Sequence, residues 1–403
     1  MPQLDADVLV IGAGIVGLST ARALLRRDPA RRVMVVDKEL TVAAHQSGHN
    51  SGVIHSGVYY RPDSDKLAMV RSARSELLHF ARDHGITVEI CGKVVVALDV
   101  DEVPRLDVLE HRAAANRLTT RRLDRVGLSE REPHIAGVAA LLVPDAGIID
   151  FRAVASALHD ELIDAGAEVR LGHRVVGVEV RSRRVRVSTD RGDLLAGSIV
   201  NCAGLHSDRL AELAGADTAG VRIMAFRGEY HELRESARHL VRHLVYPLPD
   251  PAFPFLGVHL TRMVDGSIHA GPNAVPALHR EGYQWRRISA RDTAEVLMAP
   301  RTWRLARRYW RTGLGEVRRS LSRHAFLSAL QRLCPDLTPA DLTPAPAGVR
   351  AQAIGSDGSL LDDFAFADGR RAVHVINAPS PAATASFAIA AAVAEHHDEL
   401  MNA

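Results

Sequence analysis

Residues 6–27, ADVLVIGAGIVGLSTARALLRR, constrain the fold more than any other stretch of this sequence. The apolar run VLVI is typical of a buried parallel strand, and glycines follow it in G-x-G-x-x-G spacing. Gly12 lets the chain turn tightly, Gly14 lets the backbone approach a pyrophosphate, and Gly17 lets the helix pack close to the strand. The pattern predicts a strand, a phosphate-binding turn and a helix whose N-terminal N–H groups face the phosphates.

A second strand, RRVMVVDKE, reaches Asp37, twenty residues after Gly17. A carboxylate at this position accepts hydrogen bonds from ribose hydroxyls and would repel a 2′-phosphate. The two strands together predict a dinucleotide site that suits either NAD or FAD. A glycine-rich turn without a ligand is the alternative.

The composition argues against several classes of partner. Fifty basic and 48 acidic residues among 403 give a net charge of +2, so no overall field favours nucleic acid. Three cysteines lie far apart without C-x-x-C spacing, which argues against a disulfide framework or a metal site and fits a reducing compartment. The sequence has no signal-peptide pattern before the first strand and no apolar run long enough to span a bilayer. We expect a cytoplasmic protein.

Nucleotide-type elements recur at three places in the chain, with different material between them. SIVNCAG and AVHVIN are apolar strands followed by helical segments, whereas the region from about 221 to 340 consists of short strand-like runs broken by proline and glycine. Such interruption favours a flavin-type α/β architecture over a simple NAD domain. The expected division is 1–92, 150–220 and 341–403 for a discontinuous FAD-binding domain, and 93–149 and 221–340 for an antiparallel substrate-binding domain.

Six segments carry a more specific pattern: GAGIVGLSTARAL, QSGHNSGVIHSGVYY, FRGEYHEL, YPLPDPAFPFLGVHLTRMVDGSIHAGPNAV, AGVRAQA and NAPSPAATAS. Together they resemble the L-2-hydroxyglutarate oxidase/dehydrogenase family, a branch of the FAD-dependent amino-acid-oxidase-like (DAO) superfamily. The resemblance covers essentially the whole chain. It implies a Rossmann-like FAD domain of the DAO/glutathione-reductase type. It also implies oxidation of L-2-hydroxyglutarate to 2-oxoglutarate, with electrons passed to oxygen or a quinone.

The resemblance also implies which residues contact FAD. The glycine turn and the end of the second strand match the pyrophosphate and ribose site, and residues 49–52 match the segment along the flavin. The residues implied to hold the cofactor are Gly12, Gly14, Gly17, Asp37, Lys38, His49, Asn50, Ser51, Gly52, Val175, Ala203, Gly204, Pro379, Ser380, Pro381, Ala382 and Ala383. The last five form the loop before the final helix, whose N-terminal N–H groups would stabilise a reduced flavin.

The stretch HNSGVIHSGVYY, residues 49–60, is rich in neutral hydrogen-bonding groups that can hold the edge of a flavin ring. His55 within it is the candidate base. Oxidation of an alcohol requires the hydroxyl proton to leave, and a neutral imidazole suits that task near pH 7. The alternative is a structural histidine that is hydrogen-bonded near the flavin.

Arg350, in AGVRAQ, stands where relatives in the superfamily carry an arginine that clamps the substrate carboxylate. A guanidinium can meet a carboxylate with two parallel hydrogen bonds and so fix the orientation of the substrate. A five-carbon diacid needs a second anchor. The candidates are His259, which we rank first, and Tyr60, Arg262, His269 and Asn273, each of which could instead be an ordinary residue of the sheet.

The segment 301–326 combines tryptophans with many arginines. Its apolar residues Trp303, Ala306, Trp310, Leu314, Val317 and Leu321 recur at three- and four-residue steps. Such a basic helix could rest on an anionic membrane surface where a quinone accepts electrons. The alternative that we favour is a helix pair, weakened at Gly313 and Gly315, that packs its tryptophans inward. His396 and His397 are expected at the surface.

Two other functions stay open at the level of sequence. One is a related FAD oxidase of another 2-hydroxy acid or of an amino acid. The other is a flavin-binding protein without turnover that works through protein contacts or membrane recruitment.

Overall fold

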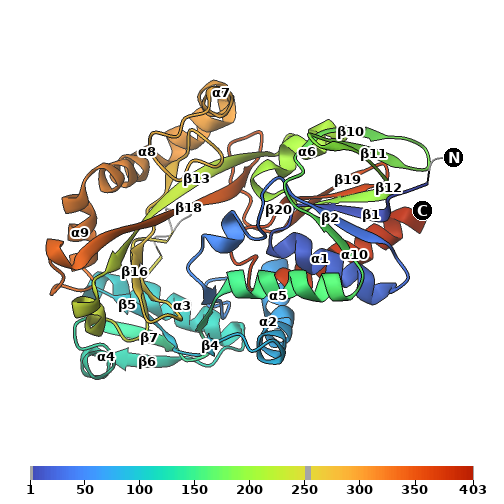
Figure 1. Ribbon diagram of the computed structural model, residues 1–403. Coiled ribbons are helices and arrows are strands. Elements are labelled where there is room, and N and C mark those ends of the chain that lie inside the picture. The colour runs from blue at the N-terminus through green and yellow to red at the C-terminus, as the bar shows by residue number, and fades with distance from the viewer. Residues whose placement is uncertain (1–2, 250–255, 403) are drawn as a thin grey trace.

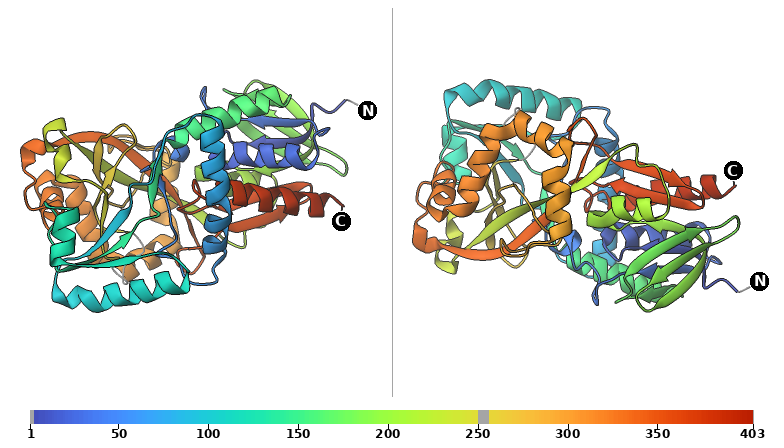
Figure 2. Two further views of the ribbon diagram at one scale, coloured as in Figure 1. Left: turned by 90° about the horizontal axis from the view of Figure 1, so that it is seen from below. Right: turned by 90° about the horizontal axis from the view of Figure 1, so that it is seen from above.

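The computed structural model describes residues 3–249 and 256–402. Residues 250–255, which belong to the YPLPDPAFPFLGVHL part of the resemblance, lie outside this description. Figures 1 and 2 show two lobes side by side, with both chain ends at the outer end of the first lobe. The expected α/β architecture with a second sheet is confirmed.

The first lobe is built on an eight-stranded sheet. In spatial order, its main path is β10 (Val175–Val180), β11 (Val185–Thr189), β12 (Gly192–Asn201), β1 (Ala6–Ile11), β2 (Val33–Val36) and β9 (Glu168–Arg170), while β20 (Ala372–Asn377) pairs with β12 and β19 (Ala365–Gly369) pairs with β20. Strands β12, β1, β2, β9 and β20 are joined by parallel pairing. Strands β10 and β11 form the expected antiparallel hairpin beside them. The central strands are apolar because both of their faces are covered.

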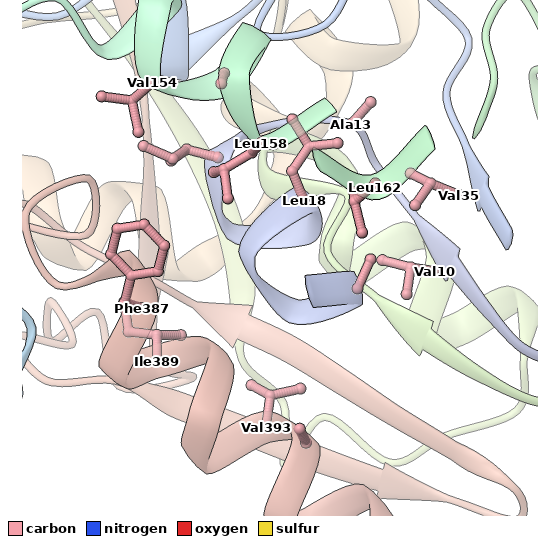
Figure 3. Packing of buried hydrophobic residues seen from close by; sticks show 14 of the residues in the cluster. Val10, Ala13, Leu18, Val35, Val154, Leu158, Leu162, Phe387, Ile389 and Val393 are labelled. Carbon is pink, nitrogen blue, oxygen red and sulfur yellow. The ribbon is translucent and has the colours of Figure 1, made fainter. Parts of the chain in front are cut away.

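Five helices accompany this sheet: α1 (Ile15–Arg27), α2 (Asp65–Asp83), α5 (Phe151–Asp164), α6 (Ser207–Leu213) and α10 (Ser386–Asn402). Figure 3 shows side chains of α1, α5 and α10 meeting those of β1 and β2 in one core. Leu18 of α1, Leu158 of α5 and Val393 of α10 are fully buried there. Helices α5 and α10 therefore hold α1 in place, with its first turn at the carboxyl end of β1.

The second lobe is built on a nine-stranded sheet, which is antiparallel except where β14 pairs with β5. Its spatial order is β17 (Val275–Pro276), β13 (Arg222–Leu233), β16 (Ile268–Gly271), β15 (His259–Arg262), β14 (Leu244–Pro247), β5 (Lys93–Ala97), β7 (Ala139–Val143) and β6 (Arg121–Asp124), with β18 (Leu342–Ile354) paired to β13. The register of β18 on β13 runs from Leu342 opposite Leu233 to Ile354 opposite Arg222. The domain boundary expected at residue 341 would assign β13 and β18 to different domains although the two strands are paired. We propose to move this boundary beyond Ile354.

A small sheet and several helices complete the fold. The three-stranded sheet has the order β3 (Val53–Ile54), β8 (Gly147–Ile149) and β4 (Val88–Glu89). The remaining helices are α3 (Val103–Ala115), α4 (Arg125–Arg131), α7 (Ala290–Met298), α8 (Pro300–Leu321) and α9 (Arg323–Gln331), with short 3-10 helices η1 (Gln46–Gly48), η2 (Val100–Glu102), η3 (Gly204–His206), η4 (Glu235–Leu240) and η5 (Pro339–Asp341).

Two local expectations were wrong. Helix α8 is not interrupted at Gly313 or Gly315 but is kinked at Tyr309, whose φ of −118° and ψ of 21° are non-helical, and both of its tryptophans are exposed rather than packed inward. His397 is buried at 2% exposure, and its Nε2 lies 2.8 Å from Ser198 Oγ. Its position follows from the helical repeat of α10, because Val393 and Ala394 lie one turn earlier on the same buried face.

Candidate active site

A cavity of about 890 Å³ is lined by residues of both lobes. Its walls come from the start of α1, the segment 44–51, the loop after β12, the loop before α10 and strand β18. The volume falls in the range of cofactor and ligand sites. Segments far apart in the sequence thus meet here, as the FAD assignment requires.

The glycine turn brings the start of α1 against the sheet edge. Gly12 has φ of +116°, and a Cβ there would lie 2.4 Å from the Cys202 carbonyl oxygen. A Cβ on Gly17 would lie 1.9 Å from the Gly12 oxygen, so Gly17 acts through packing and does not line the cavity. Gly14 lines the cavity and is the N-cap residue of α1, so no side chain caps this end of the helix. This helix end suits a pyrophosphate.

Asp37 and Lys38 lie at the nucleotide end of the cavity. The Asp37 carboxylate accepts hydrogen bonds from the backbone N–H groups of Ala13 (2.6 Å) and Glu39 (2.8 Å). Lys38 Nζ pairs with Glu39 and lies 2.7 Å from the Glu281 carboxylate. Glu39, Glu281 and His45 could together hold a metal ion, but the Lys38 ammonium already lies against both carboxylates.

The segment 46–52 forms a long neutral wall of the cavity. Asn50 shapes it from within, because its Nδ2 donates to the Ser47 oxygen (2.7 Å) and its Oδ1 accepts from Gly52 N–H (2.8 Å). His49 and Ser51 line the cavity, whereas Gly52 supplies a turn with φ of +63° behind it. Sequence reasoning missed Ser47, whose hydroxyl accepts from Ile15 N–H, and Gln46, whose Oε1 accepts from Ala351 N–H.

The remaining expected cofactor residues line the cavity: Val175, Ala203, Gly204, Pro379, Ser380, Pro381, Ala382 and Ala383. Thr384, which sequence reasoning missed, ties the loop before α10 to the segment after β3. Its Oγ1 accepts from His55 N–H (3.2 Å) and donates to the Val53 oxygen (3.3 Å). A helix N-terminus, a ribose-side carboxylate and a neutral slot therefore occur in one cavity. This donor set fits FAD.

His55 and Tyr60 stand together at the other end of the cavity. The Tyr60 hydroxyl lies 3.2 Å from His55 Nδ1, which leaves Nε2 free of this contact. Burial lowers the pKa of His55 well below its usual value, and the charges of Lys93 and Arg350 lower it further. The imidazole is therefore neutral at pH 7, the protonation state that a base requires.

Arg350 extends from β18, opposite Phe226 of β13, into the space beside His55. It also lines a smaller cavity of about 60 Å³, together with His55, Tyr246 and His259. Among the described residues no carboxylate pairs with the Arg350 guanidinium. It is therefore available to an anionic ligand.

The other residues that were expected to anchor the second carboxylate are less well suited than Arg350 to bind an anion. His259 lines only the smaller cavity, and its Nδ1 lies 2.8 Å from the Gly257 oxygen. Burial lowers the pKa of His259 to about 3, so the ring is neutral and its Nε2 offers a lone pair rather than a proton. Arg262 lies 3.4 Å from Glu89 and does not line either cavity. Asn273 is bonded to Glu229, and His269 lies outside both cavity walls.

Sequence reasoning found Lys38 but missed the other two lysines around the cavity, Lys66 and Lys93. Only three of the 50 basic residues are lysine, and all three lie in or near this site. Lys66 lines the cavity wall, and Lys93 acts electrostatically on His55. In a chain that uses arginine almost everywhere else, this rarity was the signal that could have found them.

The FAD dependent oxidoreductase (DAO) family profile matches residues 7–396. Among solved structures, the chain is similar to dithionite-reduced L-alpha-glycerophosphate oxidase from Mycoplasma pneumoniae with FAD bound. That match has a TM-score of 0.79 and 21% identity, and covers 99% of this chain and 95% of the other. Glycine oxidase from Geobacillus kaustophilus matches with a TM-score of 0.74 and 17% identity, over 98% and 95% of the two chains. This chain belongs to the FAD-dependent oxidoreductase family.

Curated relatives of this chain within the family include L-2-hydroxyglutarate dehydrogenases. The enzyme of Indibacter alkaliphilus is 44% identical over 393 residues, which cover 97% of this chain and 98% of the relative. The enzyme of Escherichia coli K12 is 43% identical, over 96% and 91% of the two chains. The human mitochondrial enzyme is 39% identical, over 96% and 88%.

Proposed function

We propose that this chain oxidises L-2-hydroxyglutarate to 2-oxoglutarate. The observation that carries the proposal is that a neutral His55 and Arg350, which has no carboxylate partner among the described residues, both line the FAD-type cavity. An amino-acid oxidase whose substrate reacts as a free amine needs no base, so a histidine at this place favours a hydroxy acid. The names of the curated relatives support the same substrate.

In this proposal each residue has a defined task. Arg350 binds the carboxylate beside the reacting carbon and fixes which face of that carbon is presented. His55 Nε2 takes the hydroxyl proton, and Tyr60 accepts from Nδ1–H and so holds the tautomer that leaves Nε2 unprotonated. FAD, when bound, supplies the acceptor for the hydride that leaves the same carbon.

The charges around His55 make its basicity depend on the substrate. Lys93, Arg350 and Lys66 together depress the pKa of His55. A dicarboxylate that enters the site neutralises part of this positive charge and therefore raises the pKa of the imidazole. A dicarboxylate substrate thus makes His55 a stronger base for the removal of the substrate's own hydroxyl proton.

Anaerobic mixing of the holoenzyme with substrates tests the proposed activity. We expect L-2-hydroxyglutarate to bleach the flavin absorbance and L-glutamate, which has the same carbon skeleton, to leave it unchanged. Bleaching by L-glutamate alone would support an amino-acid oxidase. No bleaching by any hydroxy or amino acid would support a flavin protein without turnover. Reoxidation by air and by a quinone analogue then identifies the electron acceptor.

We also propose that the outer face of α8 contacts an anionic membrane surface. Trp310, Leu314 and Leu321 follow the kink at Tyr309, and their spacings of four and seven residues place them on one face of that part of the helix. They are 55% to 69% exposed, and Trp303, before the kink, is 61% exposed. Leu305 and Glu316 lie on the buried face. Helix α8 lies on the outside of the second lobe (Figure 1). Among the described helices, none is long and apolar enough to cross a bilayer.

Arginines complete this surface. Arg307, Arg311 and Arg318 are exposed, and Arg311 and Arg318, seven residues apart after the kink, lie on one side of the helix beside the apolar face. Tryptophan and leucine that enter the interface, with arginines beside lipid phosphates, are the arrangement of a peripheral amphipathic helix. The surface would bring the cofactor site close to a membrane quinone.

Co-sedimentation with lipid vesicles tests the membrane proposal. We expect binding to phosphatidylcholine vesicles that contain phosphatidylglycerol, weaker binding at high salt, and loss of binding when Trp303 and Trp310 are both replaced by serine. Leu40→Ser, on the first lobe and 75% exposed, is the matched control and should bind as the wild type does. Equal binding by the double variant would refute the proposal.

A further inference from the structure

Lys93 is a buried cation for which the proposed mechanism gives no direct task. It begins β5 and is 1% exposed. Lys93 and Val95 share a face of the sheet because they lie two residues apart, and Tyr246 of β14 pairs with Val95 on that face. The Lys93 ammonium lies 4.2 Å from the Tyr246 ring centroid and 5.2 Å from the Tyr59 ring centroid. Two aromatic rings therefore hold it in place.

The Lys93 ammonium lacks the partner that a buried charge normally has. Among the described residues, no carboxylate or hydrogen-bond acceptor contacts it, whereas Lys38 pairs with Glu281 and Lys66 with Asp362. Burial lowers the pKa of Lys93 to about 7. A buried ammonium without a counter-ion is costly for the fold, and such groups concentrate at functional sites.

Tyr59, next to Lys93, has an unused donor. Its hydroxyl is buried and has no hydrogen-bond partner among the described residues. Burial raises the pKa of Tyr59 well above 10, so the group stays a phenol that can donate. Tyr59 also lines the large cavity. The Lys93 ammonium lines neither cavity itself, but it lies 5.2 Å from the ring of Tyr59, which lines the large cavity and carries an O–H group without a partner among the described residues.

Both groups lie close to the reacting end of the cavity. Tyr246, whose ring contacts the Lys93 ammonium, lines the smaller cavity together with His55 and Arg350. After burial, the charge of Lys93 does most to lower the pKa of His55, followed by that of Arg350. A ligand bound by Arg350 therefore has Lys93 within its electrostatic reach.

We propose that Lys93 and Tyr59 bind the second carboxylate of the substrate, the one farther from the reacting carbon. This inference rests on the proposed function, because it takes Arg350 as the anchor of the first carboxylate. Lys93 Nζ and the Tyr59 hydroxyl both donate to the incoming oxygens, so one carboxylate satisfies both unpaired groups. The pair selects a dicarboxylic 2-hydroxy acid over a monocarboxylic one of equal length.

Binding of two five-carbon acids to the oxidised holoenzyme tests the inference without any turnover. Glutarate carries the second carboxylate and pentanoate lacks it, and the change in flavin absorbance gives the Kd of each. In Lys93→Met we expect the Kd of glutarate to rise on the order of 100-fold and that of pentanoate to stay the same. In Tyr59→Phe we expect a rise of about tenfold for glutarate alone.

Arg262→Met is the matched control, because Arg262 is also a cation of the second lobe's sheet but lines neither cavity and lies 3.4 Å from Glu89. It should keep the preference of the wild type for glutarate. Equal weakening of both acids in Lys93→Met, or the same loss of preference in Arg262→Met, would overturn the inference.

The pH dependence gives a second readout. Because the pKa of Lys93 is about 7 in the free enzyme, the neutral amine that prevails above pH 7 must take up a proton to bind glutarate. The Kd of glutarate should rise up to about tenfold per pH unit there, and Lys93→Arg should abolish this rise while keeping the preference. A flat profile in the wild type would overturn the inference. Failure of L-2-hydroxyglutarate to bleach the flavin would instead refute the proposed function, since glutarate binding is measured independently.

Discussion

Replacement of His55 by glutamine removes the proposed base and little else. The backbone N–H of residue 55 still donates to Thr384 Oγ1, so the contact between the segment after β3 and the loop before α10 is kept. The amide of glutamine can still hydrogen-bond to Tyr60 but cannot accept the proton of an alcohol. General-base catalysis contributes a factor on the order of 100 or more, which corresponds to about 2.7 kcal/mol of barrier.

Anaerobic stopped-flow reduction by L-2-hydroxyglutarate measures this loss directly. We expect His55→Gln to bind FAD as the wild type does and to be reduced on the order of 100-fold more slowly. Tyr60→Phe, which removes only the orienting hydroxyl, should slow reduction about tenfold, in keeping with the 3.2 Å contact. An unchanged rate in His55→Gln with FAD bound would remove His55 from the role of base.

Three further results are expected. Arg350→Met should raise the KM for L-2-hydroxyglutarate about 100-fold in steady-state assays, because one carboxylate loses its partner, and a normal KM would contradict the clamp. Arg280→Met should lower the free energy of unfolding in urea by about 3–5 kcal/mol, because it leaves Asp208 buried without its cation, and a negligible change would refute this. The acid limb of kcat/KM should lie below pH 6.5, because burial and cations depress the pKa of His55, and Lys93→Met should move it to higher pH; an unmoved limb would contradict this coupling.

Local sequence signals predicted the nucleotide half of the site well. The G-x-G-x-x-G spacing places Gly12 and Gly14 at the cavity because both the turn and the close approach are properties of a few consecutive residues. The segments 49–52 and 379–383 were assigned through the family resemblance, and all of their residues except Gly52 line the cavity. Gly52 shows that a position within a motif can serve the turn rather than the ligand.

The substrate half depended on strand pairing that no local pattern encodes. Lys93 meets Tyr246 because β5 pairs with β14 across about 150 residues of sequence. His259 was ranked first as an anchor, yet its contact with the Gly257 oxygen and its burial keep it neutral. Trp310 was expected to pack inward because its spacing alone cannot tell which face of an amphipathic helix meets the protein.

The most direct measurement is a crystal structure of the FAD-loaded protein with glutarate bound. We expect the flavin between the 49–55 segment and the loop before α10, one carboxylate within about 3.2 Å of the Arg350 guanidinium, and the other at a similar distance from Lys93 Nζ and the Tyr59 hydroxyl. Glutarate bound away from Arg350, or a flavin outside this slot, would contradict the account.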